Sequence, residues 1–262
     1  MSTFESNFQR KEVKYRLTPQ QYVRIRGALA GYMTPDKYGT CAINTCYLDT
    51  PERYLIEKSL EKPKYKEKLR VRRYGDAQDP STPTFVEIKK KFKGIVYKRR
   101  VCMSARAAEA FLAGMAYERA VTLHPLEDAA AQAESLSPVS RQIAREIFAF
   151  RRRYGHLEPS MDIRVMRTAW KLTKEGRAET PFDLRLTFDE HMRSRDRFNP
   201  RALWEDIADD GEVLMEIKVT GAYPLWLVDI LNEVGCKPTS FSKYGTAYTN
   251  LVKGGKQCSK AS

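Results

Sequence analysis

The chain has 262 residues and carries 46 Lys and Arg against 33 Asp and Glu, a formal net charge of +13 at pH 7. Apolar residues make up 42% of the sequence, with 14 Tyr and 11 Phe, which supplies a packed core and excludes an intrinsically disordered chain. The basic excess favours polyanionic partners, namely nucleic acid, anionic lipid or phosphate-rich small molecules.

Eight stretches have the period-two alternation or the residue composition of β-strands. In chain order they span about 8–17, 41–49, 66–74, 84–92, 95–103, 160–170, 183–190 and 212–220. The short turn at 92–95, Phe-Lys-Gly-Ile, predicts a hairpin between the fourth and the fifth of these strands.

Helices are predicted between the strands. Thr18 and Ser137 each precede a proline, and Ser104 precedes an alanine-rich run, so all three residues are expected to cap helices. The expected helices span about 18–30, 104–115, 137–152 and 224–232. Residues 126–136 form a connector with helical propensity and residues 173–182 a surface loop. Because there is no internal repeat and no clear linker, one domain over 1–262 is expected, with its core at about 8–253.

Charged side chains occupy every second position on several predicted strands and therefore share one face of each strand. The clearest run is Lys66, Lys68, Arg70 and Arg72, which alternates with apolar residues. The same spacing holds for Arg10, Glu12, Lys14 and Arg16; for Glu87, Lys89 and Lys91; for Lys98 and Arg100; for Arg185, Thr187 and Asp189; and for Glu216 and Lys218.

A solvated strand face would explain any one of these runs, but not all of them together. Like charges on adjacent strands repel one another, and residues 89–100 hold seven basic side chains and no acid. A bound polyanion would remove this repulsion. A small barrel normally fills its interior with side chains, whereas a charged interior needs water and a ligand. The sequence therefore predicts a closed antiparallel β-barrel of eight strands with flanking helices, whose charged interior binds a run of phosphates.

A few carboxylates lie among these cations. They are Glu12, Glu87, Asp189 and Glu216. Carboxylates are not needed to bind phosphate, so they either form ion pairs with neighbouring Lys and Arg or hold a divalent metal that also contacts phosphate oxygens. For Glu216 the metal role is favoured, and for Glu12 and Glu87 both roles stay open.

Eight short segments, in order, resemble the polyphosphate polymerase (VTC) domain family of the triphosphate tunnel metalloenzyme, or CYTH-like, superfamily. They are RKEVKY at 10–15, KLRVRRY at 68–74, FVEIKKK at 85–91, VYKRR at 96–100, RTAW at 167–170, LRLTFD at 184–189, LMEIKV at 214–219 and SFSKYG at 240–245. The resemblance implies an eight-stranded tunnel. It also implies a reaction that transfers the γ-phosphoryl group of ATP to a growing polyphosphate chain and releases ADP, with Mn²⁺ or Mg²⁺ as cofactor.

Matching the motifs residue by residue assigns roles to individual side chains. The residues implied to act in catalysis by binding the triphosphate or the polymer are Lys14, Arg70, Arg72, Lys89, Lys98, Arg167 and Arg185. Those implied to bind substrate are Lys68, Lys218, Ser242 and Lys243. The implied metal ligand is Glu216, with Glu12 and Glu87 as further candidates. For Arg167 the alternation pattern does not give an inward direction, which rests on the resemblance and requires a bulge or a different strand phase.

Two alternatives remain. A CYTH-like triphosphate hydrolase usually opens with an ExExK motif, whereas the equivalent positions here are Arg10, Glu12 and Lys14, with one acid fewer. A non-enzymatic binder of polyphosphate or nucleic acid is the other alternative. Tyr15 and Tyr74, like Tyr47, fall on predicted strands where packing is a simpler role than base stacking, and there is no nucleic-acid-binding motif. ATP and polyphosphate, and no nucleic acid, are therefore the expected partners.

Cysteine usage and hydropathy predict the surroundings of the protein. The five cysteines are odd in number and form no Cys-x-x-Cys pair, which is typical of reduced structural thiols and a cytoplasmic location. No apolar run approaches the roughly 18 residues that a membrane-spanning helix needs. The first twelve residues lack the apolar stretch of a signal peptide. Direct membrane insertion is therefore not expected.

Overall fold

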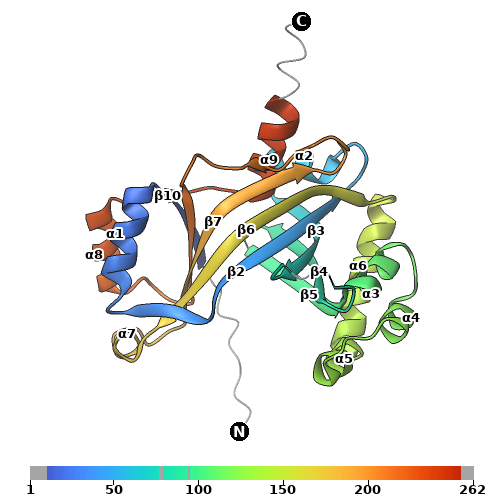
Figure 1. The fold of residues 1–262 in the computed structure, drawn as a ribbon, viewed down its shortest axis with the longest axis horizontal. Coiled ribbons are helices and arrows are strands. Elements are labelled where there is room, and N and C mark those ends of the chain that lie inside the picture. Colours follow the sequence, from blue (N-terminus) through green and yellow to red (C-terminus); the bar gives the residue numbers. More distant parts are fainter. Residues whose placement is uncertain (1–10, 77–78, 94, 255–262) are drawn as a thin grey trace, which may run out of the picture. The chain divides into compact units, whose positions relative to one another are not determined.

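The computed structural model describes residues 11–76, 79–93 and 95–254. Arg10, Gly94 and Cys258, which contribute to the expectations above, lie outside the described residues. The chain divides into two compact units (Figure 1). Unit 1 consists of Met1–Cys41, Val165–Met192 and Ala208–Phe241, and unit 2 of Ala42–Arg164, Arg193–Ile207 and Ser242–Ser262. The expected single domain stays a prediction.

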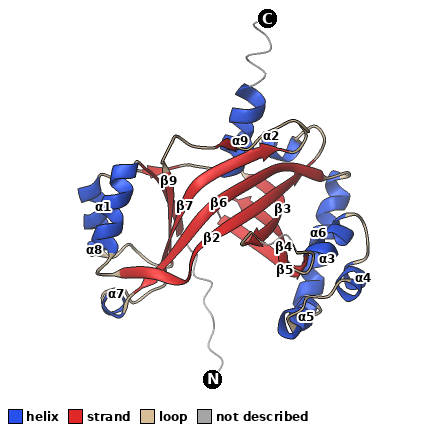
Figure 2. Ribbon diagram, viewed as in Figure 1, coloured by secondary structure: helices blue, strands red, loops and turns tan. Residues whose placement is uncertain are grey.

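All eight predicted strands are present, and several are longer than predicted (Figure 2). They are β1 (Lys11–Leu17), β2 (Met33–Asp49), β3 (Tyr65–Tyr74), β4 (Pro83–Phe92), β5 (Ile95–Ser104), β6 (Glu158–Leu172), β7 (Leu184–Asp196) and β9 (Val213–Val219). The strands β8 (Glu205–Asp206) and β10 (Pro238–Thr239) were not predicted, because two residues are too few to show an alternation.

The strands form one sheet in the order β10-β1-β9-β7-β6-β2-β3-β4-β5, and β8 pairs with β7 off this path. The pairs whose register is defined are antiparallel, including the predicted β4–β5 hairpin. The α+β class and the large antiparallel sheet with flanking helices are therefore confirmed. The closed barrel is not confirmed, because the order has two ends, β10 and β5.

In unit 1, two helices cover the apolar face of the strands. The helices α1 (Pro19–Leu29) and α8 (Leu225–Val234) contact each other and lie side by side (Figure 1). Their side chains pack on alternate residues of β1, β7 and β9. The strand residues of this core include Tyr15, Leu17, Leu184, Leu186, Phe188, Met215, Ile217 and Val219. The charged residues at the intervening positions consequently lie on the other face of these strands.

In unit 2, the apolar face of β3, β4 and β5 packs against the helices α3 (Ala105–Leu112), α4 (Tyr117–Leu123) and α6 (Pro138–Tyr154). The strand residues of this core include Leu69, Val71, Val86, Ile88, Val101 and Met103. Each aliphatic side chain buried in this way stabilises the fold by about 1.5–3 kcal/mol. A slip of one residue in register would move the whole set to the other face, so this core fixes the direction of the charged side chains.

The predicted helix caps are confirmed by their hydrogen bonds. Thr18 and Gln21 form a reciprocal capping box, with side chain to backbone distances of 3.1 and 3.2 Å. Ser104 Oγ accepts from the Ala107 N–H at 3.0 Å, and Ser137 Oγ accepts from the N–H three residues on at 3.1 Å. The helix that begins after Ser104 ends at residue 112, three residues earlier than predicted.

Most of the short helices were not predicted, although α5 (Ala129–Ser135) lies in the connector 126–136, which was expected to have helical propensity. The segment 173–182, expected as a loop, contains α7 (Lys174–Ala178), whose first turn is capped by Thr173 Oγ1 accepting from the Gly176 N–H at 3.0 Å. The remaining short elements are α2 (Tyr54–Leu60), α4, α9 (Lys243–Tyr248) and a π-helix (Thr249–Gly254). Helices of five to seven residues complete too few turns to show a helical period.

Within the described part of the chain, no helix combines the length and the hydrophobicity that crossing a membrane requires.

Candidate functional site

The register of β3, β4 and β5 arranges the charged residues of unit 2 in rows across the sheet. Lys68 lies opposite Lys89, which in turn lies opposite Lys98, so three lysines form one row. The unit 2 charged face consists of Lys66, Lys68, Arg70, Arg72, Glu87, Lys89, Lys91, Lys98 and Arg100. It therefore holds eight cations and one carboxylate, the distribution expected of a surface that binds a polyanion.

The single carboxylate of this face, Glu87, lies in the row beside the lysines. It is fully buried and flanked by Arg70 on β3 and Arg100 on β5. Arg70 Nε donates to one of its oxygens at 2.6 Å, and Lys98 Nζ lies 2.9 Å from the other. Burial raises the pKa of Glu87, but Arg70, Arg72 and Lys98 outweigh it and lower the pKa to about 2. Glu87 is thus an ionised partner of the cations, the arrangement that its ion-pairing alternative requires.

The cations of unit 2 also repel one another. Burial lowers the pKa of Arg72, and the neighbouring Arg70 lowers it further. Burial likewise lowers the pKa of Lys98, Arg70 and Arg72 add to this effect, and Glu87 opposes it. One carboxylate therefore does not neutralise the face. A bound anion would relieve the repulsion, because an opposite charge favours the charged form of each cation.

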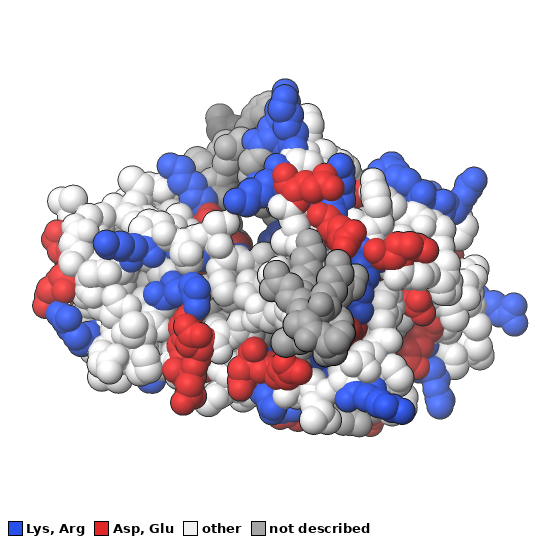
Figure 3. All heavy atoms as spheres, turned by 90° about the horizontal axis from the view of Figure 1, so that it is seen from above, with Lys and Arg blue, Asp and Glu red and all other residues white. Residues whose placement is uncertain are grey.

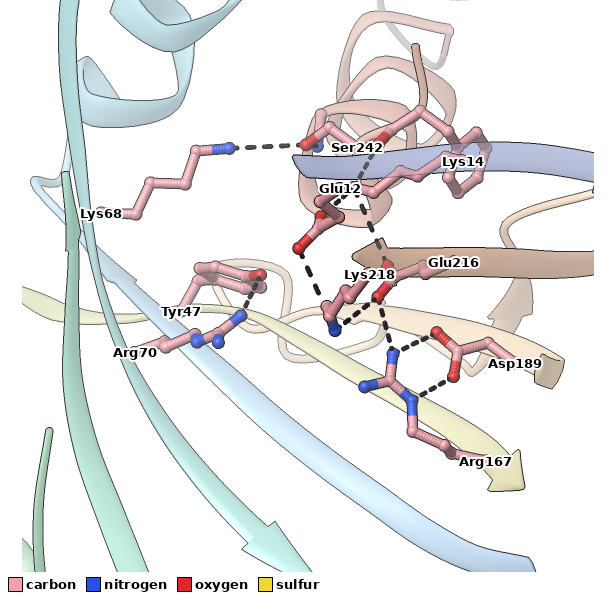
Figure 4. Close-up of polar contacts among 12 residues, drawn as sticks. Glu12, Lys14, Tyr47, Lys68, Arg70, Arg167, Asp189, Glu216, Lys218 and Ser242 are labelled. Atoms are coloured by element: carbon pink, nitrogen blue, oxygen red, sulfur yellow. Dashed lines mark hydrogen bonds and ion pairs between the residues drawn. The ribbon is translucent and has the colours of Figure 1, made fainter. Parts of the chain in front are cut away.

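Tyr47 joins this face, which sequence reasoning missed. It lies opposite Arg70 on the neighbouring strand β2, and its hydroxyl accepts from Arg70 Nη1 at 3.4 Å (Figure 4). Its ring stacks on that of Tyr244, with centroids 4.3 Å apart. Burial raises the pKa of Tyr47, but Arg70, Lys68 and Arg72 lower it to about 7. The signal in the sequence is its position, since residue 47 falls on the alternation that faces Arg70.

Asp49, at the end of β2, supports the same region. This fully buried carboxylate accepts from three backbone N–H groups, those of Thr50, Leu55 and Ile56, at 2.8–2.9 Å. It also accepts from the Tyr244 hydroxyl at 2.8 Å. Burial raises the pKa of Asp49, and these bonds oppose the shift. Asp49 thereby ties the start of α2 to Tyr244 and fixes the ring on which Tyr47 stacks.

Ser242 and Lys243, both predicted to contact substrate, lie at the start of α9. Ser242 Oγ accepts from the Gly245 N–H and lies 3.5 Å from Lys68 Nζ (Figure 4). The Lys68 ammonium group also lies 5.3 Å from the centre of the Tyr244 ring. The structure therefore brings Ser242 next to one predicted phosphate-binding lysine, with Lys243 as the next residue in the chain.

The charged residues of unit 1 also lie in rows. On β1 and β9, Lys14 is opposite Glu216 and Glu12 is opposite Lys218. Lys14 Nζ lies 3.6 Å from Glu12 and 3.8 Å from Glu216, and Lys218 Nζ lies 3.4 Å from Glu216 (Figure 4). The unit 1 charged face consists of Glu12, Lys14, Arg167, Arg185, Asp189, Glu216 and Lys218. Acids and cations alternate here, so most charges have an opposite neighbour.

Arg167 joins the unit 1 charged face, although the alternation of β6 does not predict it. Its guanidinium group forms a two-pronged ion pair with the buried Asp189, with Nη2 2.6 Å from one carboxylate oxygen. The same Nη2 lies 3.4 Å from Glu216 (Figure 4). The direction implied by the family resemblance therefore agrees with the structure, and Arg167 connects two carboxylates.

Arg185 lies at the rim of this face. The register places it opposite Lys218, and its Nε is 3.5 Å from Asp183. Its side chain is 65% exposed, in contrast to that of Arg167 at 18%. Arg185 is thus the more accessible of the two arginines for a ligand from solution.

The carboxylates of unit 1 lie among cations. Glu216 is buried and shared by Lys14, Lys218 and Arg167. In the part of the chain that the structure describes, no group of three or more His, Cys, Asp and Glu side chains could hold a metal ion. Mg²⁺ is commonly held by one or two carboxylates together with substrate phosphates and water. Glu216 alone could therefore hold such an ion only with phosphates and water as the other ligands.

The distribution of charge over the molecular surface differs from that on the charged faces of the two units. On the side of the molecule drawn in Figure 3, Lys and Arg lie in separate groups, with Asp and Glu between them. Among the described residues on this side, the basic groups do not join into a continuous stripe of the kind that a nucleic-acid backbone follows. The prediction that nucleic acid is not a partner stays a prediction.

Comparison with known proteins identifies the family. A family model for the VTC domain matches residues 9–252. The chain belongs to the VTC domain family, which confirms the resemblance derived from the eight motifs. Membership in this family supports a role in binding triphosphate or polyphosphate. A comparison with curated proteins gave no match.

A comparison with solved structures gave further matches. One, from Bacillus halodurans, is provisionally named an adenylate cyclase and has 12% identity and a TM-score of 0.45, covering 89% of this chain and 95% of its own. Another of the same provisional name, from Vibrio parahaemolyticus, has 8% identity and a TM-score of 0.44, covering 92% and 98%. A chain of the Schizosaccharomyces pombe Mediator head module has 9% identity and a TM-score of 0.36, covering 92% and 95%.

Proposed function

We propose that the protein is a polyphosphate polymerase that transfers the γ-phosphoryl group of ATP to a growing polyphosphate chain and releases ADP. The observation that carries this proposal is the unit 2 charged face, with eight cations for one carboxylate. A row of three lysines across β3, β4 and β5 concentrates like charge, and a chain of phosphates would relieve its mutual repulsion. The closed barrel and the cytoplasmic location predicted from the sequence belong to the same proposal.

The cations of unit 2 have different tasks in this proposal. Arg70 and Arg72 offer planar guanidinium groups, which bind phosphate oxygens in pairs and suit the triphosphate. Lys68, Lys89 and Lys98 offer point charges on flexible stems, which suit a polymer that moves between turnovers. Support comes from the register, which gives the arginines and the lysines separate rows.

In unit 1 we assign Lys14, Arg167, Arg185 and Lys218 to phosphate binding, and Glu216 to a divalent ion. Mn²⁺ or Mg²⁺ held there together with phosphate oxygens would supply positive charge to the transferred phosphoryl group. Glu12 is a further candidate ligand, because it shares Lys14 and Lys218 with Glu216.

The chemistry needs no covalent nucleophile from the protein. An oxygen of the terminal phosphate of the polymer forms a bond to the γ-phosphorus of ATP. The bond from the γ-phosphorus to its bridging oxygen breaks, and that oxygen leaves with ADP. The protein contributes alignment and stabilisation of the charge on the transferred group, which accounts for a site rich in Arg and Lys.

A triphosphate hydrolase is the second candidate, and one observation favours it. The unit 1 charged face brings together three carboxylates, Glu12, Asp189 and Glu216, which come from three different motifs. Hydrolysis would need a metal to activate water. Asp189, however, is engaged by Arg167 on both oxygens, which leaves fewer acids for a metal.

Incubation of the purified protein with ATP and Mn²⁺ tests this proposal, with ADP, free phosphate and chain length as readouts. Long phosphate chains with matching ADP release are expected. Free phosphate without chains would establish the hydrolase instead. Absence of turnover with retained polyphosphate binding would leave the non-enzymatic binder. The same incubation without Mn²⁺ is the control for the metal and should give little turnover.

A further inference from the structure

The residues that follow the arginines on the charged face of unit 2 are aromatic. On β3 the alternation Lys66, Lys68, Arg70, Arg72 continues to Tyr74, the last residue of the strand. On β4, Phe85 lies opposite Arg72 and two residues before Glu87. Side chains at this spacing share one face of a strand. The face therefore runs from lysines through arginines to a pair of aromatic rings.

The two rings form a defined cluster. Tyr74 and Phe85 meet edge to face, with ring centroids 5.6 Å apart and planes inclined by 84°. Tyr74 is 39% exposed, and Phe85 is half-buried. The guanidinium group of Arg100 lies 4.6 Å from the centre of the Phe85 ring. Tyr15, by contrast, is buried in the core, as predicted for a packing residue. The Tyr74 ring therefore reaches solvent beside Arg72 while one edge contacts Phe85.

Flat aromatic and guanidinium surfaces are the groups on which nucleobases stack. We infer that Tyr74 and Phe85 bind the base of the nucleoside triphosphate, so that its phosphates extend along the face toward Arg72 and Arg70. Tyr74 lies four positions after Arg70, about 13 Å along a strand, so a base on Tyr74 and a phosphate on Arg70 occupy separate parts of the face. The inference rests on the proposed function and adds a direction to it, with the nucleotide at the aromatic end and the polymer at the lysine end.

Stacking is tolerant of base identity, because every base has a π-face. No Asp, Asn or Gln side chain is needed in this account to read the edge of the base. We therefore expect ATP and GTP to bind with similar affinity. Inorganic tripolyphosphate, which has no base, should use the arginines and the lysines alone.

The test is a calorimetric titration of the full-length chain and its variants with ATP and with tripolyphosphate. Tyr74→Ala should weaken ATP binding by roughly tenfold and leave tripolyphosphate binding unchanged. Tyr74→Phe keeps the ring and should restore ATP binding, and Phe85→Leu should resemble Tyr74→Ala. Tyr97→Ala is the matched control, because Tyr97 is 52% exposed on β5 but alternates with the charged residues. It should change neither affinity.

The outcomes separate this inference from the proposal on which it rests. An equal loss of ATP and tripolyphosphate affinity in Tyr74→Ala would overturn the base-binding role, while phosphate binding itself would stand. Unchanged ATP affinity in both Tyr74→Ala and Phe85→Leu would overturn it as well. If the wild-type chain bound neither ATP nor tripolyphosphate, the result would contradict the proposed function itself.

Discussion

In unit 2, one buried carboxylate, Glu87, faces eight cations, whereas in unit 1 three carboxylates alternate with four cations. Both faces follow the same period-two alternation, so the alternation by itself does not distinguish them. The net charge of each face does distinguish them. The first face is left strongly positive and suits an anion. The second is close to balanced and suits an anion that brings a metal ion with it.

The largest effect is expected from the loss of the Arg70 side chain. Its side chain is buried, and its Nε bonds to Glu87, whose burial is complete. Arg70→Ala leaves that carboxylate with fewer partners, and breaking a buried ion pair in this way costs about 3–5 kcal/mol of the free energy of unfolding. Denaturant unfolding measures the loss. Arg185→Ala, in the exposed part of the unit 1 charged face, is the control and should cost less than about 1 kcal/mol. Equal losses would show that Arg70 and Glu87 are not coupled.

The next prediction concerns Glu216, on the unit 1 charged face. Glu216→Gln should keep tripolyphosphate binding but lose the strengthening of that binding by Mn²⁺, by roughly tenfold or more. Titrations with and without Mn²⁺ measure this. Glu212→Gln is a matched control in the same unit, since Glu212 pairs with Arg16 rather than with the residues around Glu216. A Glu216→Gln protein whose phosphate binding still responds to Mn²⁺ like the wild type would refute the metal role.

Tyr47 gives an effect that is small at pH 7 and grows as the pH rises. Its pKa of about 7 in the folded protein lies below the ordinary value of 10, because nearby cations favour the phenolate. The resulting stabilisation is fully present above pH 10 and is lost as the pH falls through 7, so it grows between these values. The difference in unfolding free energy between wild type and Tyr47→Phe should therefore increase from pH 7 to 10. A difference that stays constant over this range would contradict the assignment.

The sequence predicted the strands and the charged faces because both depend on a short period that core packing enforces. Leu69, Val86 and Ile88 must lie under the helices of unit 2, and this requirement fixes the direction of Lys68 and Glu87. Contacts between residues far apart in the chain leave no such periodic pattern in the sequence. The partners of Arg167, and the bond between Asp49 and Tyr244, join residues far apart in the chain. No local pattern in the sequence specifies them.

Aromatic residues on strands have different surroundings in the two units. Tyr15 alternates with the charged residues of β1 and is in the core, whereas Tyr74 is in phase with the charged residues of β3 and is exposed at the end of a charged face. The difference arises from what covers each face. Helices α1 and α8 pack over the face of unit 1 that carries Tyr15. The face of unit 2 that carries Tyr74 lies opposite its helices.

The central claim is that the unit 2 charged face binds a phosphate chain, and adjacent lysines on β4 test it most directly. Lys89 lies in the lysine row, and its neighbour Lys90 points to the other side of the strand. Titration with polyphosphate at fixed salt should show that Lys89→Ala weakens binding by roughly ten- to hundredfold, as for a lost charge-assisted contact. Lys90→Ala, with the same change of net charge, should bind like the wild type. Equal weakening by both substitutions would show that binding follows net charge alone, and would contradict a specific phosphate-binding face.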